Sequence, residues 1–402
     1  MIDTIQRPLF VGVIGAGRLG GFHAQKLANN PNVKLLGVAD PDPAARKRVA
    51  LECGTESFAD PMAMLDFLRA DDMPLDAVVV AAPSLHHHAI GMDCLRRGVH
   101  VLMEKPLART TREADELLHA AAAHGAVLQV GHVERFNPAT RTAFPHLDSP
   151  RLIEASRTSG FTFRSMDIGV VLDLMIHDID LVLSLNGSPI SRVAASGMTL
   201  MGGHEDVADA RIEFTDGCVA TLHASRVSHT AARRMRVVTS NAMATIDFAA
   251  RRTELVRPSR ALLDGQLGAD SLSPEELEHL KSNLHEQHLP LEIFEDDAVD
   301  ALTLEQSEFF DAIQTNRFPR VSGREGRDAV ALAHAILDDI ERNAAGGDHE
   351  GEPLVKRAPV PFPGVSPAPG WNIITDAPAQ EKESEAARFD ENDLDETQRK
   401  AG

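Results

Sequence analysis

Short apolar runs alternate with amphipathic stretches through the first third of the chain. The apolar runs are bounded by polar turns and predict buried strands, and the stretches with helical periodicity between them predict helices. Strands are expected at 9–15, 33–40, 76–82, 99–103 and 126–131, and helices from the turn after residue 15 to about 30 and at about 43–53, 61–70, 88–97 and 110–124. This alternation is typical of a parallel, doubly wound sheet in an α/β domain.

The pattern changes from about Arg151. Strand-like segments follow one another closely there, joined by short turns such as Asp216-Gly217. They are expected at 152–158, 191–201, 206–215, 218–226, 235–239 and 243–247, with a helix at 170–185 ahead of most of them and helices at 302–315 and 324–342 at the end. The pattern predicts a second domain of the α+β class with an open, mostly antiparallel sheet.

Length and composition divide the chain further. Its 402 residues are long enough for two domains and a tail, and 43% hydrophobic residues are enough for ordinary cores. We expect a first domain at 1–138, a second at 139–342 and an acidic, Pro-rich, mobile tail at 343–402, within which 362–374 is the part suited to local docking. The acidic segment 261–300 receives no element from its pattern.

Charge and cysteine content restrict the partners and the compartment. The net charge of −20 argues against nucleic acid and against an anionic membrane surface, but a few well-placed arginines still suffice for a phosphorylated small molecule. Cys53, Cys94 and Cys218 are far apart and form no CxxC pair, which is typical of a reducing compartment, here the cytoplasm. Neither a signal peptide nor a transmembrane segment is expected from the hydropathy pattern.

A glycine-rich hexamer lies between the first predicted strand and the first predicted helix. It reads Gly15, Ala16, Gly17, Arg18, Leu19 and Gly20, which matches GxGxxG. In that position the motif predicts a Rossmann domain, in which the glycines allow a tight turn, close approach of a pyrophosphate and close packing of the helix. Asp40 ends the second strand at the usual distance, where a carboxylate accepts hydrogen bonds from ribose hydroxyls and repels a 2′-phosphate. The predicted cofactor is therefore NAD.

Two further loops follow predicted strands of the same sheet, where ligands of open α/β sheets bind. After strand 76–82, the loop from Ala82 and Pro83 runs into three consecutive histidines at 86–88, of which His87 is the expected cofactor contact. Neighbouring side chains point in different directions, so a shared metal is not expected and no metal site is predicted. After strand 99–103 come Glu104 and Lys105. A lysine there can hold a substrate hydroxyl and stabilise an alkoxide, whereas the alternative is an ordinary surface lysine.

Asp173 and His177 lie four residues apart on an otherwise apolar helix and therefore share a face. A histidine beside a carboxylate can remove the proton of a hydroxyl while hydride leaves the same carbon. The alternative is a buried histidine of the core. The accompanying acids favour a chemical role, because isolated buried charges are costly.

The motifs together resemble the Gfo/Idh/MocA oxidoreductases. The resemblance covers about residues 9–342 and rests on GAGRLG at 15–20, AAPSLHHHAI at 81–90, MEKPLA at 103–108, the segment 173–178 and VSGREGRDAVALAHAI at 321–336. It implies a bound nicotinamide cofactor contacted by these loops, Glu104 included, and an open sheet that forms homodimers or homotetramers. It also implies that Lys105, Asp173 and His177 surround the reacting carbinol, with His177 as the acid/base.

Two stretches, at 131–138 and 164–180, resemble more narrowly the branch of this family that oxidises C3 of UDP-N-acetylglucosamine. In that branch the keto sugar passes to an aminotransferase. The resemblance implies sugar or diphosphate contacts by Arg135, Asn137, Arg157 and Arg164, each arginine having a surface ion pair as its alternative. Two other functions stay open, namely oxidation of inositol or another polyol and a non-catalytic sensor that binds a dinucleotide.

Overall fold

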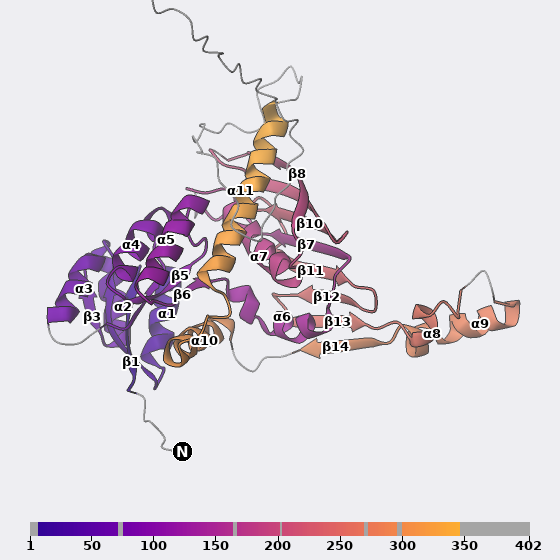
Figure 1. The fold of residues 1–402 in the computed structure, drawn as a ribbon, viewed down its shortest axis with the longest axis horizontal. Coiled ribbons are helices and arrows are strands. Elements are labelled where there is room, and N and C mark those ends of the chain that lie inside the picture. Colours follow the sequence, from indigo (N-terminus) through magenta and orange to yellow (C-terminus); the bar gives the residue numbers. More distant parts are fainter. Residues whose placement is uncertain are drawn as a thin grey trace, which may run out of the picture.

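The computed structural model describes residues 7–70, 75–163, 167–201, 203–268, 272–295 and 300–345. Figure 1 shows two sheets with the long helix α11 (Gly323–Ala345) between them. The first sheet has six parallel strands in the order β3-β2-β1-β4-β5-β6. These strands are β1 (Leu9–Ile14), β2 (Val33–Ala39), β3 (Glu56–Phe58), β4 (Ala77–Val80), β5 (His100–Glu104) and β6 (Leu128–Gly131). The predicted doubly wound sheet is confirmed.

Helices cover both faces of the first sheet, which is why its strands are almost continuously apolar. One face packs against α1 and α2, and the other packs against α3, α4 and α5. Their bounds are α1 (Arg18–Ala28), α2 (Pro43–Cys53), α3 (Pro61–Ala70), α4 (His87–Leu95) and α5 (Thr111–Ala123). Every residue of β4 and β6 is buried as a result.

The helix α10 (Ala301–Thr315) returns late in the chain to complete the first sheet's core. Phe309 and Phe310 belong to the same buried cluster as Val11 and Leu27, and Lys26 binds Asp300 at 2.7 Å. This differs from the expectation that a helix at 302–315 finishes the second domain. Its periodicity shows that one face is apolar, but not which sheet that face covers.

The second sheet has eight strands in the order β14-β13-β12-β11-β7-β10-β9-β8, and only β7 and β10 run parallel. The predicted mostly antiparallel sheet is therefore confirmed, with two strands that the sequence pattern did not suggest, β13 and β14. The bounds are β7 (Leu152–Thr158), β8 (Ile190–Met198), β9 (Val207–Phe214), β10 (Val219–Ser225), β11 (Ala232–Val238), β12 (Met243–Asp247), β13 (Arg252–Val256) and β14 (Leu291–Glu295).

One face of the second sheet is covered by α6 (Pro138–Ala143), α7 (Ile176–Leu185) and α11, which close a large apolar core. The other face carries charged side chains in alternate positions. These pair across neighbouring strands, as Arg236 does with Glu154 and Arg234 does with Asp247. The outward face is therefore a polar surface of paired charges.

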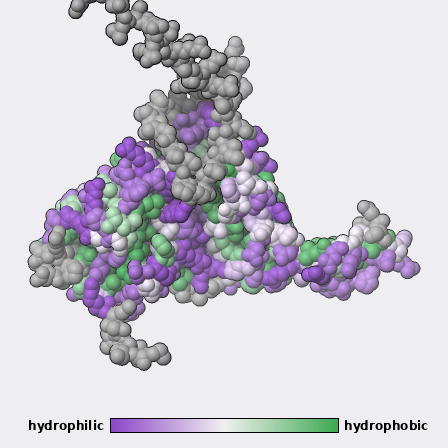
Figure 2. All heavy atoms as spheres, in the orientation of Figure 1, coloured by the Kyte–Doolittle hydropathy of each residue, from purple (hydrophilic) through white to green (hydrophobic). Residues whose placement is uncertain are grey.

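A helical arm leaves the second sheet between β13 and β14, far from the rest of the molecule (Figure 1). It contains α8 (Arg260–Leu263) and α9 (Pro274–Asn283), neither of which has a buried residue. Hydrophilic and hydrophobic residues mix on its surface (Figure 2). Helix α9 starts with a capping box of Ser273 and Glu276 and with proline at its first position. The capping residues that predict the start of this helix lie in the segment 261–300, where the hydrophobic pattern alone predicts no element.

Within the described ranges, no helix is both long and apolar enough to cross a bilayer. The expected tail lies almost wholly outside the described residues, which end at 345. The domain boundaries at residues 138 and 342 stay predictions.

The return of α10 can be tested by truncating one of its core side chains. Phe309 is fully buried, so Phe309→Ala should lower the free energy of unfolding by about 3–5 kcal/mol, since it removes a whole ring and leaves a cavity. Phe318 is 90% exposed, so the matched control Phe318→Ala should change stability by no more than about 0.5 kcal/mol. Chemical denaturation followed by circular dichroism measures both, and equal stabilities would contradict the packing of α10 on this core.

Candidate active site

The glycine-rich turn has the geometry that its motif predicts. Gly15 has a φ of +100°, and a Cβ there would lie 2.5 Å from the carbonyl oxygen of Ala81. A Cβ on Gly20 would lie 1.8 Å from the Gly15 oxygen, so α1 packs against the turn only because this position is glycine. Gly17 instead faces open space and is the residue before α1. An anion can therefore approach the backbone and the N-terminal end of the helix.

Asp40 is bound to this turn by its own carboxylate. One oxygen accepts the backbone N–H of Ala16 at 2.6 Å, and the other accepts the N–H of Asp42 at 2.8 Å. Each oxygen keeps a further lone pair for an outside donor. The structure thus brings Asp40 to the glycine-rich turn, as a ribose-binding carboxylate requires.

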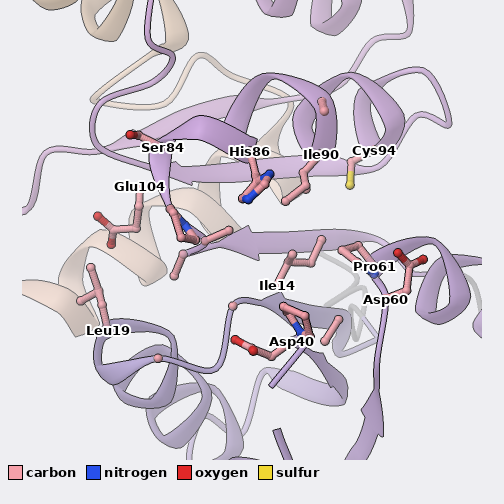
Figure 3. Close-up of a pocket in the computed structure, with 18 of the residues that line it drawn as sticks. Ile14, Leu19, Asp40, Asp60, Pro61, Ser84, His86, Ile90, Cys94 and Glu104 are labelled. Atoms are coloured by element: carbon pink, nitrogen blue, oxygen red, sulfur yellow. The ribbon is translucent and has the colours of Figure 1, made fainter. Parts of the chain in front are cut away.

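A cavity of about 850 Å³ runs along the carboxyl ends of the first sheet's strands. Of the residues predicted to bind the cofactor, it is lined by Gly15, Gly17, Arg18, Leu19, Asp40, Ala82, Pro83, Glu104 and Lys105. Figure 3 shows Glu104 and Ser84 towards one end and Asp60 and Pro61 towards the other, with Asp40 below. The size, the open backbone at Gly17 and the carboxylate of Asp40 fit a dinucleotide whose adenosine lies towards Asp60.

Lys105 connects the two sheets at the end of the cavity that holds Glu104. Its ammonium donates to the backbone carbonyl of Asp173 at 2.7 Å and to the Asp173 carboxylate at 3.0 Å. Asp173 lies in a π-helical turn, Val171–Met175, that leads into α7. Such turns present side chains that a regular helix would direct elsewhere. Both groups also line the cavity, so they can reach a ligand.

His177 lies one helical turn beyond Asp173, on α7. No hydrogen bond between the two side chains is present among the described residues, and Nδ1 of His177 is buried without a hydrogen-bond partner there. The two residues share a helix face as expected, but the Asp173 carboxylate is engaged by Lys105 and does not contact the His177 ring. The ring of His132 lies edge-on at 6.5 Å. Burial, followed by the positive charges of Lys105 and Arg157, lowers the pKa of His177 well below its usual value.

The three consecutive histidines separate in the structure. His86 lines the cavity. His87, the expected cofactor contact, is buried, and its ring nitrogens face the carbonyl oxygens of Pro106 and Ala82, both at 2.8 Å. His87 thus connects the loops after β4 and β5, and its direct contact with the cofactor stays a prediction that this geometry does not favour.

The predicted substrate contacts on and near β7 lie in a buried network. Arg157 is 3% exposed and binds Asp178 with two nitrogens and Glu134 with a third. Asn137 donates to Glu134 at 2.9 Å and caps the start of α6. These bonds occupy the groups that would contact a sugar, so a direct role of Arg157 and Asn137 is not favoured, although their assignment stays a prediction.

Arg135 is similarly engaged, at 2.8 Å from both Asp180 and Glu325. Arg164 lies outside the described residues.

Sequence reasoning missed a polar cluster behind Glu104. It consists of His23 on α1 and of Glu305 and Gln306 on α10, all buried. His23 binds Glu104 at 2.7 Å and Gln306 at 2.9 Å. A lone histidine or a Glu-Gln pair inside an amphipathic helix carries no signal of its own, so only the return of α10 reveals the cluster.

Both parts of the chain match known families. Residues 9–132 match the oxidoreductase family with an NAD-binding Rossmann fold. Residues 130–245 match the GFO/IDH/MocA C-terminal domain.

Curated relatives give the same result. The chain is 34% identical to UDP-N-acetylglucosamine 3-dehydrogenase of Acidithiobacillus ferrooxidans over 82% of this chain and 96% of that protein. It is 31% identical to scyllo-inositol 2-dehydrogenase (NAD(+)) of Bacillus subtilis, over 54% of this chain and 67% of that protein.

Solved structures share the fold. The crystal structure of the Acidithiobacillus ferrooxidans enzyme aligns with a TM-score of 0.72 and 32% identity, covering 84% of this chain and 99% of that chain. Levoglucosan dehydrogenase in complex with NADH and levoglucosan aligns with a TM-score of 0.69 at 18% identity, covering 84% of this chain and 98% of that chain, which shows the fold alone. The glycine-rich turn, the carboxylate of Asp40 and these matches together show that the chain belongs to the Gfo/Idh/MocA family of NAD-binding oxidoreductases.

Proposed function

We propose that this protein oxidises a secondary hydroxyl of a sugar to a ketone with NAD⁺, and that its substrate is UDP-N-acetylglucosamine, oxidised at C3. The observation that carries the proposal is the contact of Lys105 with Asp173 at the Glu104 end of the cavity, one helical turn from His177. The similarity over 96% of a UDP-N-acetylglucosamine 3-dehydrogenase supports the choice of sugar.

Lys105 and His177 divide the work at the substrate oxygen. NAD⁺, when bound, supplies the acceptor for the hydride. Lys105 donates a hydrogen bond to the hydroxyl oxygen and stabilises the negative charge that develops there. Asp173 and its carbonyl hold the ammonium in place. His177 accepts the hydroxyl proton, for which it must be neutral beforehand, and its lowered pKa keeps it neutral near pH 7.

A nucleotide sugar also brings a diphosphate that needs a cation. Arg135 and Arg157 are held by carboxylates. Arg233 lies opposite Arg157 in the register of β11 and β7, and therefore on the same face of the sheet. Unlike Arg157, it is exposed. Its charge reaches the site, since it contributes to the lowered pKa of His177. Among the residues the structure describes, Arg233 is the candidate that best fits the diphosphate.

The same proposal includes partners and compartment. An aminotransferase is the expected consumer of the keto sugar. A homodimer or homotetramer through the outward face of the second sheet is expected, because that face is broad and regular. Three free cysteines suit the cytoplasm.

The direct test measures NADH formation from NAD⁺ with UDP-N-acetylglucosamine, UDP-glucose and myo-inositol, with a carbonyl trap to draw the oxidation forward. A signal confined to UDP-N-acetylglucosamine, with a 3-keto product by NMR, supports the proposal. Turnover of inositol alone would replace the substrate but leave the site unchanged. A chain that binds NAD⁺ and oxidises no sugar would instead be the dinucleotide-binding sensor.

Removing the ammonium of Lys105 should abolish turnover without abolishing cofactor binding. We expect Lys105→Met to lower kcat/KM by at least about 100-fold, as loss of a donor to a developing oxyanion does. Isothermal titration should still detect NAD⁺. The exposed Lys47→Met is the matched control and should retain normal kinetics. Near-normal turnover of Lys105→Met would remove Lys105 from the chemistry.

The pH profile of oxidation should report His177. A base works only when neutral, and the pKa of His177 is lowered, so kcat/KM should be flat through pH 7 and fall only in acid, below the ordinary histidine pKa of about 6.5. His177→Gln should lower kcat/KM and lose the acid limb. A wild-type profile that rises steeply between pH 7 and 9 would contradict His177 as the base.

The charge of Asp40 should decide between NAD and NADP. Asp40→Asn keeps the shape of the side chain and one acceptor oxygen for the ribose, but removes the charge that repels a 2′-phosphate. We expect the ratio of kcat/KM for NADP⁺ to that for NAD⁺ to rise at least about tenfold, because a juxtaposed like charge costs several kcal/mol. An unchanged ratio would show that another group excludes the phosphate.

A further inference from the structure

The cluster behind Glu104 is a buried group of titratable side chains that the proposed mechanism leaves unused. Glu104 lines the cavity, whereas His23, Glu305 and Gln306 lie behind it between the first sheet, α1 and α10. One ligand atom each of His23, Glu104 and Glu305 lies within 4.8 Å of the others. Two carboxyl groups so close together in a buried site need a cation or a proton.

The hydrogen bonds around His23 determine its proton. The amide nitrogen of Gln306 donates to Nδ1 of His23 at 2.9 Å and to the backbone oxygen of His23 at 3.3 Å. The second bond fixes the orientation of the amide, so Nδ1 is an acceptor. His23 is therefore neutral, its proton is on Nε2, and that N–H donates to Glu104 at 2.7 Å. Nε2 then has no lone pair for a metal, which disfavours a metal site.

Glu305 completes the charge of the cluster. It is 0% exposed, and neither carboxyl oxygen has a hydrogen-bond partner among the described residues. The side-chain amide of Gln129 donates to the backbone of Glu305, and its own oxygen is buried and without a donor. The Glu305 carboxyl group is thus buried without any donor, a surrounding that favours its neutral, protonated form. Burial, and then the charge of Glu104, raises the pKa of Glu305 well above its usual value.

We propose that Glu104 and Glu305 form a buried carboxyl pair with a single negative charge, held on Glu104 by His23 and Gln306, and that this charge makes the cavity prefer oxidised to reduced nicotinamide. The oxidised ring is positively charged and the reduced ring is neutral, so an anion at this end of the cavity stabilises only the former. This inference rests on the proposed function, because a dehydrogenase working towards oxidation must bind NAD⁺ in the presence of NADH.

The measurement is the ratio of the dissociation constants of NADH and NAD⁺, obtained by isothermal titration with the purified full chain. Glu104→Gln keeps the size of the side chain and removes the charge, and should lower this ratio roughly tenfold, as loss of one partly screened charge does. The ratio cancels any general loss of affinity from misfolding. Glu308→Gln is the matched control, because Glu308 lies on α10 and pairs with Arg317 outside the cluster.

Two further variants test how the charge is held. Glu305→Gln places a neutral amide where we infer a neutral acid, so the ratio should change less than about twofold. His23→Leu removes the donor to Glu104 and favours its protonated form, so the ratio should fall. His23→Gln supplies a new amide donor and should restore part of the ratio that His23→Leu loses. A purely structural role of His23 does not predict this difference.

Three results would overturn the inference. They are an unchanged ratio in Glu104→Gln, a fall in Glu305→Gln as large as in Glu104→Gln, and one equivalent of a transition metal in the wild-type chain by mass spectrometry that Glu305→Gln loses. Failure of the inference is distinguishable from failure of the proposed function. A chain that oxidises UDP-N-acetylglucosamine but binds both cofactor forms equally loses only the inference, whereas a chain with the expected ratio and no sugar oxidation loses only the proposed substrate.

Discussion

The contact between Lys105 and Asp173 is the constraint on which the arrangement of the candidate site depends. Lys105 follows the last residue of β5 in the first sheet, and Asp173 belongs to the π-helical turn that leads into α7, a helix that covers the second sheet. The ammonium therefore links the end of the cofactor cavity to the turn that precedes His177, the proposed base. Lys105 accepts neither a proton nor an electron in the proposed step, so its contribution depends on a fixed position of its ammonium. The lysine side chain is flexible, and its two hydrogen bonds to oxygens of Asp173 hold the ammonium in place.

A second set of ion pairs joins the helix that carries His177 to the second sheet. Arg157 joins β7, the start of α7 and the turn that contains Glu134. A buried arginine is costly unless it is paired and hydrogen-bonded, and here each of its three side-chain nitrogens donates to one of two carboxylates. Within this network, Glu134 lies just after β6, which ends at Gly131, and Asp178 lies on α7, the helix that carries His177. Several of the polar residues expected from the sequence to contact the substrate thus bind other side chains of the protein around the site.

The features that could be predicted from sequence are those whose physics is local. The glycines at 15, 17 and 20, the carboxylate of Asp40 and the alternation of strand and helix each leave a pattern within about 30 residues, and the sheets follow them. The capping box of α9 is local in the same way. The partners of Arg157, the π-helical turn at Asp173 and the cluster around His23 depend on residues far apart in the chain. Nothing in the neighbourhood of Glu305 indicates that it will meet His23 across 282 positions.

The late return of α10 has a consequence for how the protein is made. Phe309 and Phe310 complete a core whose other members begin at Leu9. A ribosome must therefore finish about three quarters of the chain before the dinucleotide-binding half can bury all of its apolar surface. Until then the part of the first sheet's core that Phe309 and Phe310 cover is open to water and to other chains, which is the condition in which nascent proteins aggregate or engage chaperones. The dinucleotide-binding half is thus early in the gene but late to fold.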